Sequence, residues 1–193
     1  MAEQSSLIFI SGGVRSGKSR FAEILAGKWK EQISGQLHYV AAGMPSDQEM
    51  NERIMRHKQD RENSGFHWRT WEIPRNLLPL SSVLSKKDIV LLDCLTTLLN
   101  NEFVHEEGRW KDKDFPETVF YKILGEIKQV VKQARATIVV SNEVLWEPMT
   151  DPGLVFSYSK VLGLLHQSLV KECDYAYLVE AGIPILMKGE GSP

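Results

Sequence analysis

Residues 12–19 of this chain carry the phosphate-binding pattern Gly-x-x-x-x-Gly-Lys-Ser. Glycines let the backbone turn its N–H groups toward a phosphate, and the start of a following helix adds partial positive charge. In such a loop Lys18 reaches the β- and γ-phosphates of a nucleoside triphosphate, and the hydroxyl of Ser19 can ligate Mg²⁺. A chance glycine-rich turn is the alternative, but a strand before the loop and a helix after it favour the phosphate site. The predicted phosphate-binding residues are Gly12, Gly13, Val14, Arg15, Ser16, Gly17, Lys18 and Ser19.

A second candidate is Asp93, the last residue of the apolar run 88–93. A carboxylate at the C-terminal end of a buried strand beside a phosphate loop is expected to bind the metal or to face the phosphates. The same residue can instead cap a helix that begins at Leu95. The two roles are compatible, so Asp93 is predicted as a metal-binding residue together with Ser19.

A histidine among cations, His57, is the third candidate. On a helix, Arg53, His57 and Arg61 are spaced i, i+4 and i+8, so they share one face. Like charges at this spacing cost stability, and an anionic ligand would relieve their repulsion. The surrounding cations also favour the neutral imidazole, which is the form that can act as a nucleophile. From these residues alone, however, a basic solvent-exposed helix face is the simpler interpretation.

Two further strand ends carry polar residues. Asn142 and Glu143 follow an apolar run, at a position where α/β sheets bind ligands, and a helix-capping Asn beside a solvated Glu is an equal alternative. Glu72 is interpreted as a surface residue when only its neighbours are considered. Trp68 and Trp71 are predicted to lie in the core or at an interface rather than to stack on bases.

These candidates need a scaffold of alternating strands and helices. The strands are continuous apolar runs, which is typical of a mostly parallel sheet covered on both faces. The last two strands are joined by a turn containing Gly182, which indicates a C-terminal antiparallel hairpin. The predicted strands are 7–10, 37–42, 88–93, 137–140, 175–179 and 183–187, and residues 66–73 are predicted as a short strand or an extended segment. The predicted helices are 18–29, 47–62, 77–84, 95–103, 118–135 and 155–173, with a polar loop at 108–116.

Length and composition set the remaining limits. The chain of 193 residues is predicted to form a single nucleotide-binding domain, 1–193, and its 42% hydrophobic content excludes intrinsic disorder. A net charge of −2 argues against a nucleic-acid partner. Cys94 and Cys173 are predicted to be small buried residues. The polar residues 1–6 do not resemble a signal peptide, and no run reaches the roughly 18 apolar residues of a membrane span, so a cytoplasmic protein is expected.

Several motifs, taken together, resemble the bifunctional adenosylcobinamide kinase / adenosylcobinamide-phosphate guanylyltransferase family of cobalamin biosynthesis. They occur in family order and with family-like spacing over about residues 7–144. The combination of His-Lys-x-x-Arg and Trp-Arg-Thr-x-Glu with the phosphate loop is far more specific than the loop alone. The motifs are GGVRSGKSRFAE at 12–23, YVAAGM at 39–44, DQEMNERIMRHKQDR at 47–61, HWRTWE at 67–72, LLDCLTTLLNN at 91–101 and VVSNEV at 139–144.

The resemblance implies a RecA-like P-loop fold and two reactions. In the first, a nucleoside triphosphate, ATP or GTP, phosphorylates the aminopropanol hydroxyl of adenosylcobinamide. In the second, GMP passes from GTP through a histidine, matching His57, to adenosylcobinamide phosphate, and Mg²⁺ accompanies the nucleotide. It also implies a homo-oligomer, since family members can assemble as trimers. The implied nucleotide contacts are the loop 12–19, Ala41, Ala42, Gly43, Lys58, Gln59, Asp60, Arg61, Glu72 and Asp93.

Residues 145–167 depart from the family pattern, because its arginines and its aspartate are missing there. Two other functions therefore remain as alternatives. One is a P-loop kinase that phosphorylates a different small molecule. The other is a noncatalytic RecA-like nucleotide-binding regulator or a nucleic-acid-associated ATPase, although the near-zero net charge speaks against nucleic acid.

Overall fold

The computed structural model describes residues 5–43, 52, 55, 58–59, 61–63, 65–105, 108–143 and 152–191. Most of the predicted helix 47–62, including His57, lies outside this part of the chain. The described residues within it, 52, 55, 58, 59, 61 and 62, are helical.

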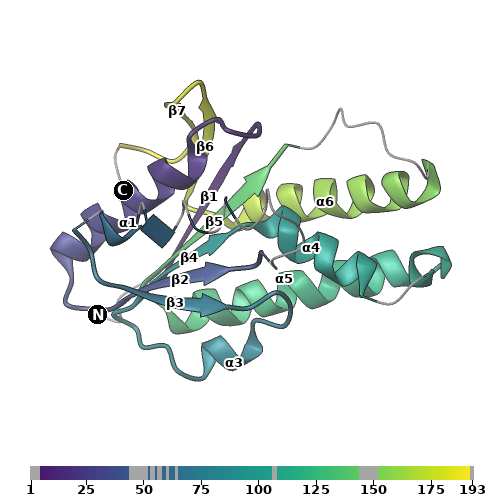
Figure 1. The fold of residues 1–193 in the computed structure, drawn as a ribbon, viewed down its shortest axis with the longest axis horizontal. Coiled ribbons are helices and arrows are strands. Elements are labelled where there is room, and N and C mark those ends of the chain that lie inside the picture. Colours follow the sequence, from purple (N-terminus) through teal and green to yellow (C-terminus); the bar gives the residue numbers. More distant parts are fainter. Residues whose placement is uncertain are drawn as a thin grey trace.

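The described residues form one seven-stranded sheet with the order β3-β2-β4-β5-β1-β6-β7 (Figure 1). All neighbouring strands are parallel except β6 and β7, which form the predicted antiparallel hairpin. The expected mostly parallel α/β sheet is confirmed. The strands are β1 (Ser6–Gly12), β2 (Leu37–Ala41), β3 (Trp68–Glu72), β4 (Ile89–Asp93), β5 (Ala136–Asn142), β6 (Tyr175–Glu180) and β7 (Ile183–Lys188).

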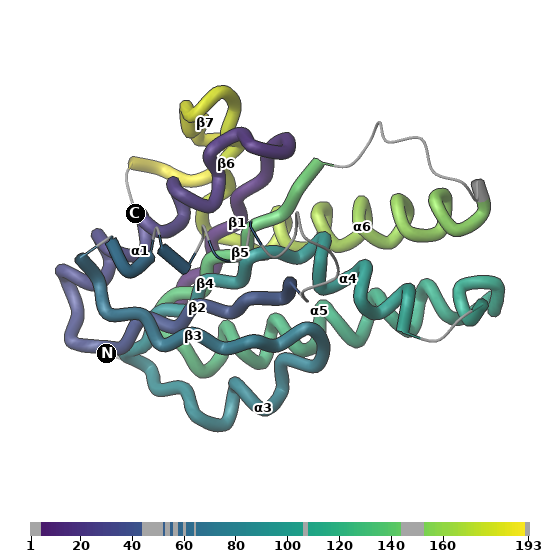
Figure 2. Tube along the Cα trace, in the orientation of Figure 1, coloured from purple at the N-terminus to yellow at the C-terminus, as the bar shows by residue number. Residues whose placement is uncertain are grey.

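Helices cover both faces of the sheet, so the side chains of each central strand divide between two cores. One core contains Ile8 and Ile10 of β1 and the inner face of α1, and the other contains Leu7 and Phe9 with residues of α3 to α6. Figure 2 shows α5 and α6 running side by side along the second face. The helices are α1 (Lys18–Gln32), α3 (Leu78–Ser81), α4 (Leu95–Val104), the 3-10 turn η1 (Arg109–Lys111), α5 (Phe115–Gln133) and α6 (Pro152–Glu172).

The predicted polar loop 108–116 is partly wrong. It contains the turn η1, and α5 begins at Phe115 rather than at Thr118. Pro116 stands in the first turn of α5, where the missing N–H costs nothing and the fixed φ suits a helix. Cys94 and Cys173 are buried and unbridged, as predicted. None of the described helices is long and apolar enough to cross a membrane.

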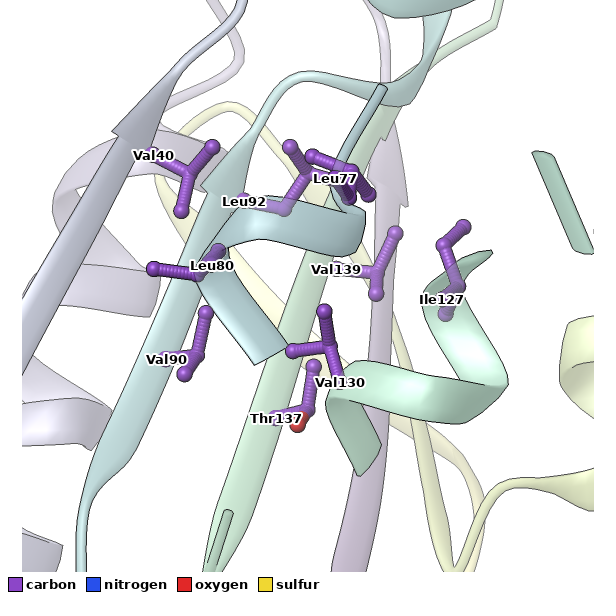
Figure 3. A pocket seen from close by; sticks show the side chains of 9 residues that line it. All are labelled: Val40, Leu77, Leu80, Val90, Leu92, Ile127, Val130, Thr137 and Val139. Carbon is purple, nitrogen blue, oxygen red and sulfur yellow. The ribbon is translucent and has the colours of Figure 1, made fainter. Parts of the chain in front are cut away.

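A small hollow of about 10 Å³ lies between the sheet, α3 and α5 (Figure 3). Eight of its nine lining residues are aliphatic, and the ninth is Thr137 of β5. The Thr137 hydroxyl is buried and has no hydrogen-bond partner within the described part of the chain. A water molecule needs two to four polar partners, so one hydroxyl among aliphatic side chains does not hold one here.

Candidate functional site

The parallel sheet brings the predicted site residues to one edge. Ala41, at the end of β2, is in register with Glu72 of β3 and with Asp93 of β4. Gly12, at the end of β1, is in register with Asn142 of β5. This edge is formed by the carboxyl ends of the strands, where open α/β sheets bind their ligands.

The phosphate loop has the backbone geometry that its glycines predict. Gly17 lies in the left-handed region with φ 91°, and Arg15 has φ 60°. The Ser16 N–H donates to the Gly13 carbonyl at 3.2 Å, which closes the turn. At Gly12, a Cβ would lie 2.4 Å from the Val179 carbonyl oxygen, so the close approach of β1 and β6 requires a glycine there.

The C-terminal hairpin supports this loop from outside. The Gly182 N–H, in the turn between β6 and β7, donates to the Ser16 carbonyl at 2.9 Å. A Cβ on Gly17 would lie only 3.3 Å from the Gly182 Cα. The conformation of this loop near the N-terminus therefore depends on Gly182, which lies near the C-terminus. No local motif reveals such a contact.

Lys18 and Ser19 begin helix α1 directly after the loop. Lys18 is 4% exposed, and its Nζ donates to the Gly13 carbonyl at 2.9 Å. This bond holds the ammonium group against the loop whose N–H groups would surround a phosphate. Val14 and Arg15, at the tip of the loop, are exposed.

Asp93 is held by a tyrosine that sequence reasoning did not select. The Tyr39 hydroxyl donates to Asp93 Oδ2 at 2.8 Å. Burial first, and then the neighbouring Asp93 carboxylate, keep the pKa of Tyr39 well above its usual value, so the hydroxyl remains protonated and can donate. Tyr39 does belong to the motif at 39–44, and that was the signal available in the sequence.

A hollow of about 510 Å³ lies beside β3, at the far end of the sheet from the hairpin. We call it the β3 hollow; it is lined by Lys58, Arg61, Glu62, Phe66, His67, Trp68, Thr70 and Glu72. The Lys58 ammonium group lies 3.0 Å from Glu72 Oε1. The volume falls within the range of small-molecule sites.

The prediction of a solvent-exposed basic helix face is wrong for Arg61, which is buried. It is 5% exposed, and its guanidinium carbon lies 3.6 Å from the centroid of the Tyr39 ring. The cation–π contact compensates part of the lost hydration of the guanidinium. Gln59 is exposed, while His57 and Asp60 lie outside the described residues.

The predicted contacts at Ala41, Ala42 and Gly43 lie directly at the strand edge. The Ala42 N–H donates to the Asp93 carbonyl at 3.2 Å, and the Asn101 side chain donates to the Ala42 carbonyl at 2.9 Å. These bonds connect the end of β2 to the end of β4 and to the C-terminal half of α4. The segment is thereby placed between the phosphate loop and the β3 hollow.

The predicted residues therefore form two groups along one edge. Strands in a sheet are about 4.8 Å apart, so Asp93, two strands from β1, lies about 10 Å from the line of that strand. Glu72, four strands from β1, lies about 19 Å from it. One group surrounds the phosphate loop and the other surrounds the β3 hollow, with Tyr39 between them.

The sequence predicted Asn142 either as a helix cap or as a ligand contact. Asn142 is the last residue of β5, the strand between β1 and β4. Its side-chain amide donates to Thr96 Oγ1 at 3.1 Å, while its Oδ1 is buried and has no hydrogen-bond partner among the described residues. The next residue, Glu143, donates its N–H to the Gly12 carbonyl at 3.1 Å and accepts from Ser11 Oγ at 3.4 Å. Both residues thus border the phosphate loop.

The sequence of this chain is similar to a known protein family and to several of its members. A family model described as cobinamide kinase / cobinamide phosphate guanyltransferase matches residues 8–187. The bifunctional adenosylcobalamin biosynthesis protein CobU of Escherichia coli is 31% identical over 189 residues, covering 94% of this chain and 99% of the relative. The bifunctional adenosylcobalamin biosynthesis protein CobP of Pseudomonas aeruginosa is 34% identical over 182 residues, covering 94% and 96%.

A solved structure supports the fold independently. It is an ATPase domain that superposes with a TM-score of 0.54 at 13% sequence identity, covering 99% of this chain and 79% of that structure. Similarity at this level of identity concerns the fold alone. The expected RecA-like P-loop architecture is confirmed.

Proposed function

Because the chain belongs to the cobinamide kinase / cobinamide phosphate guanyltransferase family, we propose that it carries out both reactions on adenosylcobinamide. The first transfers a phosphoryl group from ATP or GTP to the aminopropanol hydroxyl. The second transfers GMP from GTP to the new phosphate, which gives adenosylcobinamide-GDP and pyrophosphate. The observation that carries this proposal is the family match over residues 8–187, which includes both the phosphate loop and the β3 hollow.

The phosphate loop is the proposed donor site of the kinase step, and its residues fit a nucleotide with Mg²⁺. Ser16 Oγ is buried and lacks a hydrogen-bond partner among the described residues, and a phosphate oxygen would supply one. Ser19 and Asp93 offer the hard oxygen ligands that Mg²⁺ prefers, so we assign the metal to them. When bound, Mg²⁺ neutralises negative charge on the phosphates. Lys18 would exchange the Gly13 carbonyl for a phosphate oxygen.

The β3 hollow is the proposed GMP-transfer site. An imidazole nitrogen of His57 attacks the α-phosphorus of GTP, the bond to the β-phosphate breaks, and pyrophosphate leaves. A phosphate oxygen of adenosylcobinamide phosphate then attacks the same phosphorus and displaces the histidine. Lys58 and Arg61 would offset the negative charge that develops on the phosphoryl oxygens. The role of His57 rests on the family motif and on its chain position next to Lys58.

A labelling experiment tests the proposal. Protein incubated with Mg²⁺ and GTP labelled at the α-phosphate should retain label that is labile in acid and stable in base. His57→Asn should abolish the label. His105→Asn should retain it, because His105 is an exposed histidine at the end of α4 and does not line the β3 hollow. An unlabelled wild-type protein would refute the guanylyltransferase half.

The departure of residues 145–167 from the family pattern favours one second candidate, a P-loop kinase with another acceptor. Within this segment α6 presents Phe156, which is 70% exposed, and an exposed Lys160. This candidate predicts transfer of the γ-phosphate to a small-molecule alcohol other than adenosylcobinamide, without labelled protein. Direct competition between adenosylcobinamide and other alcohols for γ-labelled phosphate separates the two functions.

The same family membership supports three further proposals, about domain organisation, cellular location and oligomeric state. We propose that residues 1–193 act as one nucleotide-binding domain, that the protein works in the cytoplasm, and that it forms a homo-oligomer. Light scattering at several protein concentrations tests the oligomer, and a monomer at all of them would refute it.

A further inference from the structure

Tyr39 lies between the two groups of site residues and contacts a member of each. Its hydroxyl donates to Asp93 Oδ2 at 2.8 Å, and its ring faces the Arg61 guanidinium at 3.6 Å. The side chain is 3% exposed, so neither contact is shared with bulk solvent. Asp93 belongs to the phosphate-loop group and Arg61 to the β3 hollow.

The ring of Tyr39 has a fixed orientation. It meets the Trp68 ring edge-on, with 5.9 Å between centroids and an interplanar angle of 90°. Tyr39 is a residue of β2, and its backbone is in register with Leu91 of β4 and Thr70 of β3. Because strands on both sides hold the backbone and Trp68 contacts the ring, the hydroxyl is held beside Asp93.

The two contacts have different chemistry. The hydrogen bond occupies one carboxylate oxygen of Asp93 and restricts rotation of the carboxylate, which orients the other oxygen. Partners that orient a metal-binding carboxylate in this way contribute strongly to metal affinity. The ring contact instead holds a buried cation, and it depends on the aromatic face rather than on the hydroxyl.

We propose that Tyr39 is a positioning residue for both reactions: its hydroxyl orients Asp93 for Mg²⁺ at the phosphate loop, and its ring holds Arg61 in the β3 hollow. This inference rests on the proposed function, which supplies the roles of Asp93 and Arg61. Two substitutions separate the two contacts. Tyr39→Phe removes the hydroxyl and keeps the ring, whereas Tyr39→Leu removes both.

The first measurement is binding of a fluorescent GTP analogue to the full-length protein, with EDTA and then with increasing Mg²⁺. Tyr39→Phe should bind the metal-free analogue as the wild type does and should require about 10-fold more Mg²⁺ for the same gain in affinity. Tyr158→Phe is the matched control, because Tyr158 is also buried and its hydroxyl donates to the Thr96 carbonyl at 3.0 Å rather than to Asp93. The control should keep the Mg²⁺ dependence of the wild type.

The second measurement is labelling of the protein with GMP from α-labelled GTP. Tyr39→Phe should be labelled as fast as the wild type at saturating Mg²⁺, and Tyr39→Leu about 10-fold more slowly, the factor expected for loss of one buried cation–π contact. Urea unfolding of each variant establishes that it is folded, and Tyr39→Phe alone suffices to test the hydroxyl.

Two results would overturn the inference. One is an unchanged Mg²⁺ dependence in Tyr39→Phe, and the other is an equal loss of metal-free binding and Mg²⁺ dependence, which would indicate general structural support. Failure of the proposed function gives a different pattern. In that case the wild type neither labels nor phosphorylates, while the comparison of Mg²⁺ dependence between wild type and Tyr39→Phe still decides the role of the hydroxyl.

Discussion

Acidification should destabilise this protein partly through one half-buried histidine, His166 of α6. Its Nε2 shares a hydrogen bond of 2.7 Å with the Ser141 hydroxyl, and its ring meets the Phe9 ring edge-on at 5.1 Å between centroids. Burial lowers the pKa of His166 from 6.5 to about 4, because the charged imidazolium would lose its hydration. The folded protein therefore keeps this ring neutral at pH values where the unfolded chain protonates it.

The sign and size of the effect follow from proton binding. Between pH 6.5 and about 4 the unfolded state binds more protons, so the free energy of unfolding falls as the pH falls through this window. The contribution is fully present above pH 6.5. A pKa difference of about 2.5 corresponds to about 3 kcal/mol in full, and to about 2 kcal/mol at pH 5.

Urea unfolding at pH 7.5 and pH 5.0 measures this contribution. His166→Asn removes the titrating ring and keeps an amide that can bond Ser141, so it should lose about 2 kcal/mol less than the wild type between the two pH values. His105→Asn, which changes an exposed histidine at the end of α4, should behave like the wild type. Equal losses in the wild type and His166→Asn would refute the reasoning. A uniform drop in His166→Asn at both pH values reports lost packing and not titration.

Three further substitutions test the packing around the sheet. Since a Cβ at Gly12 would lie 2.4 Å from the Val179 carbonyl oxygen, Gly12→Ala should lower the free energy of unfolding by about 2 kcal/mol and the affinity for GTP about 10-fold. A Cβ at Gly13 would meet no protein atom within 4 Å, so Gly13→Ala should leave the free energy of unfolding near the wild-type value. Urea unfolding and nucleotide titration check this, and an equal loss of unfolding free energy in the two variants would contradict it. Thr137→Val removes a buried hydroxyl without a described partner, so it should raise the free energy of unfolding by about 1 kcal/mol; a lower value in urea unfolding would show that the hydroxyl is satisfied.

Local patterns explain which parts of the fold were predictable. The apolar runs that form β1, β4 and β5 are long enough to identify buried strands, and their continuity indicates a parallel sheet with both faces covered. The phosphate loop and Asp93 follow from the same reasoning, because each stands directly at the end of such a run. The start of α5 was missed because the charged residues 111–114 masked a helix that begins beside Pro116.

Contacts between distant segments were not predictable. A single sequence does not reveal that β5 lies between β1 and β4, which brings Asn142 between the phosphate loop and Asp93. The basic residues around His57 suggested a solvated face, yet Arg61 is buried against Tyr39 of another element. In both cases the deciding interaction is a tertiary contact that overrides the local preference.

The sheet order also determines when β1 can pair with its neighbours during synthesis. Both neighbours of β1 come from far along the chain, since Ser6 pairs with Ala136 and Ile8 with Tyr175, separations of 130 and 167 residues. At about 5 to 20 residues per second, roughly 10 to 30 s separate the emergence of β1 from that of β6 on the ribosome. For most of that interval β1, a strongly apolar strand, has neither of its hydrogen-bonding partners. The phosphate loop that follows β1 cannot receive the Gly182 hydrogen bond to Ser16 until the end of β6 has been synthesised, so the complete loop forms late in synthesis.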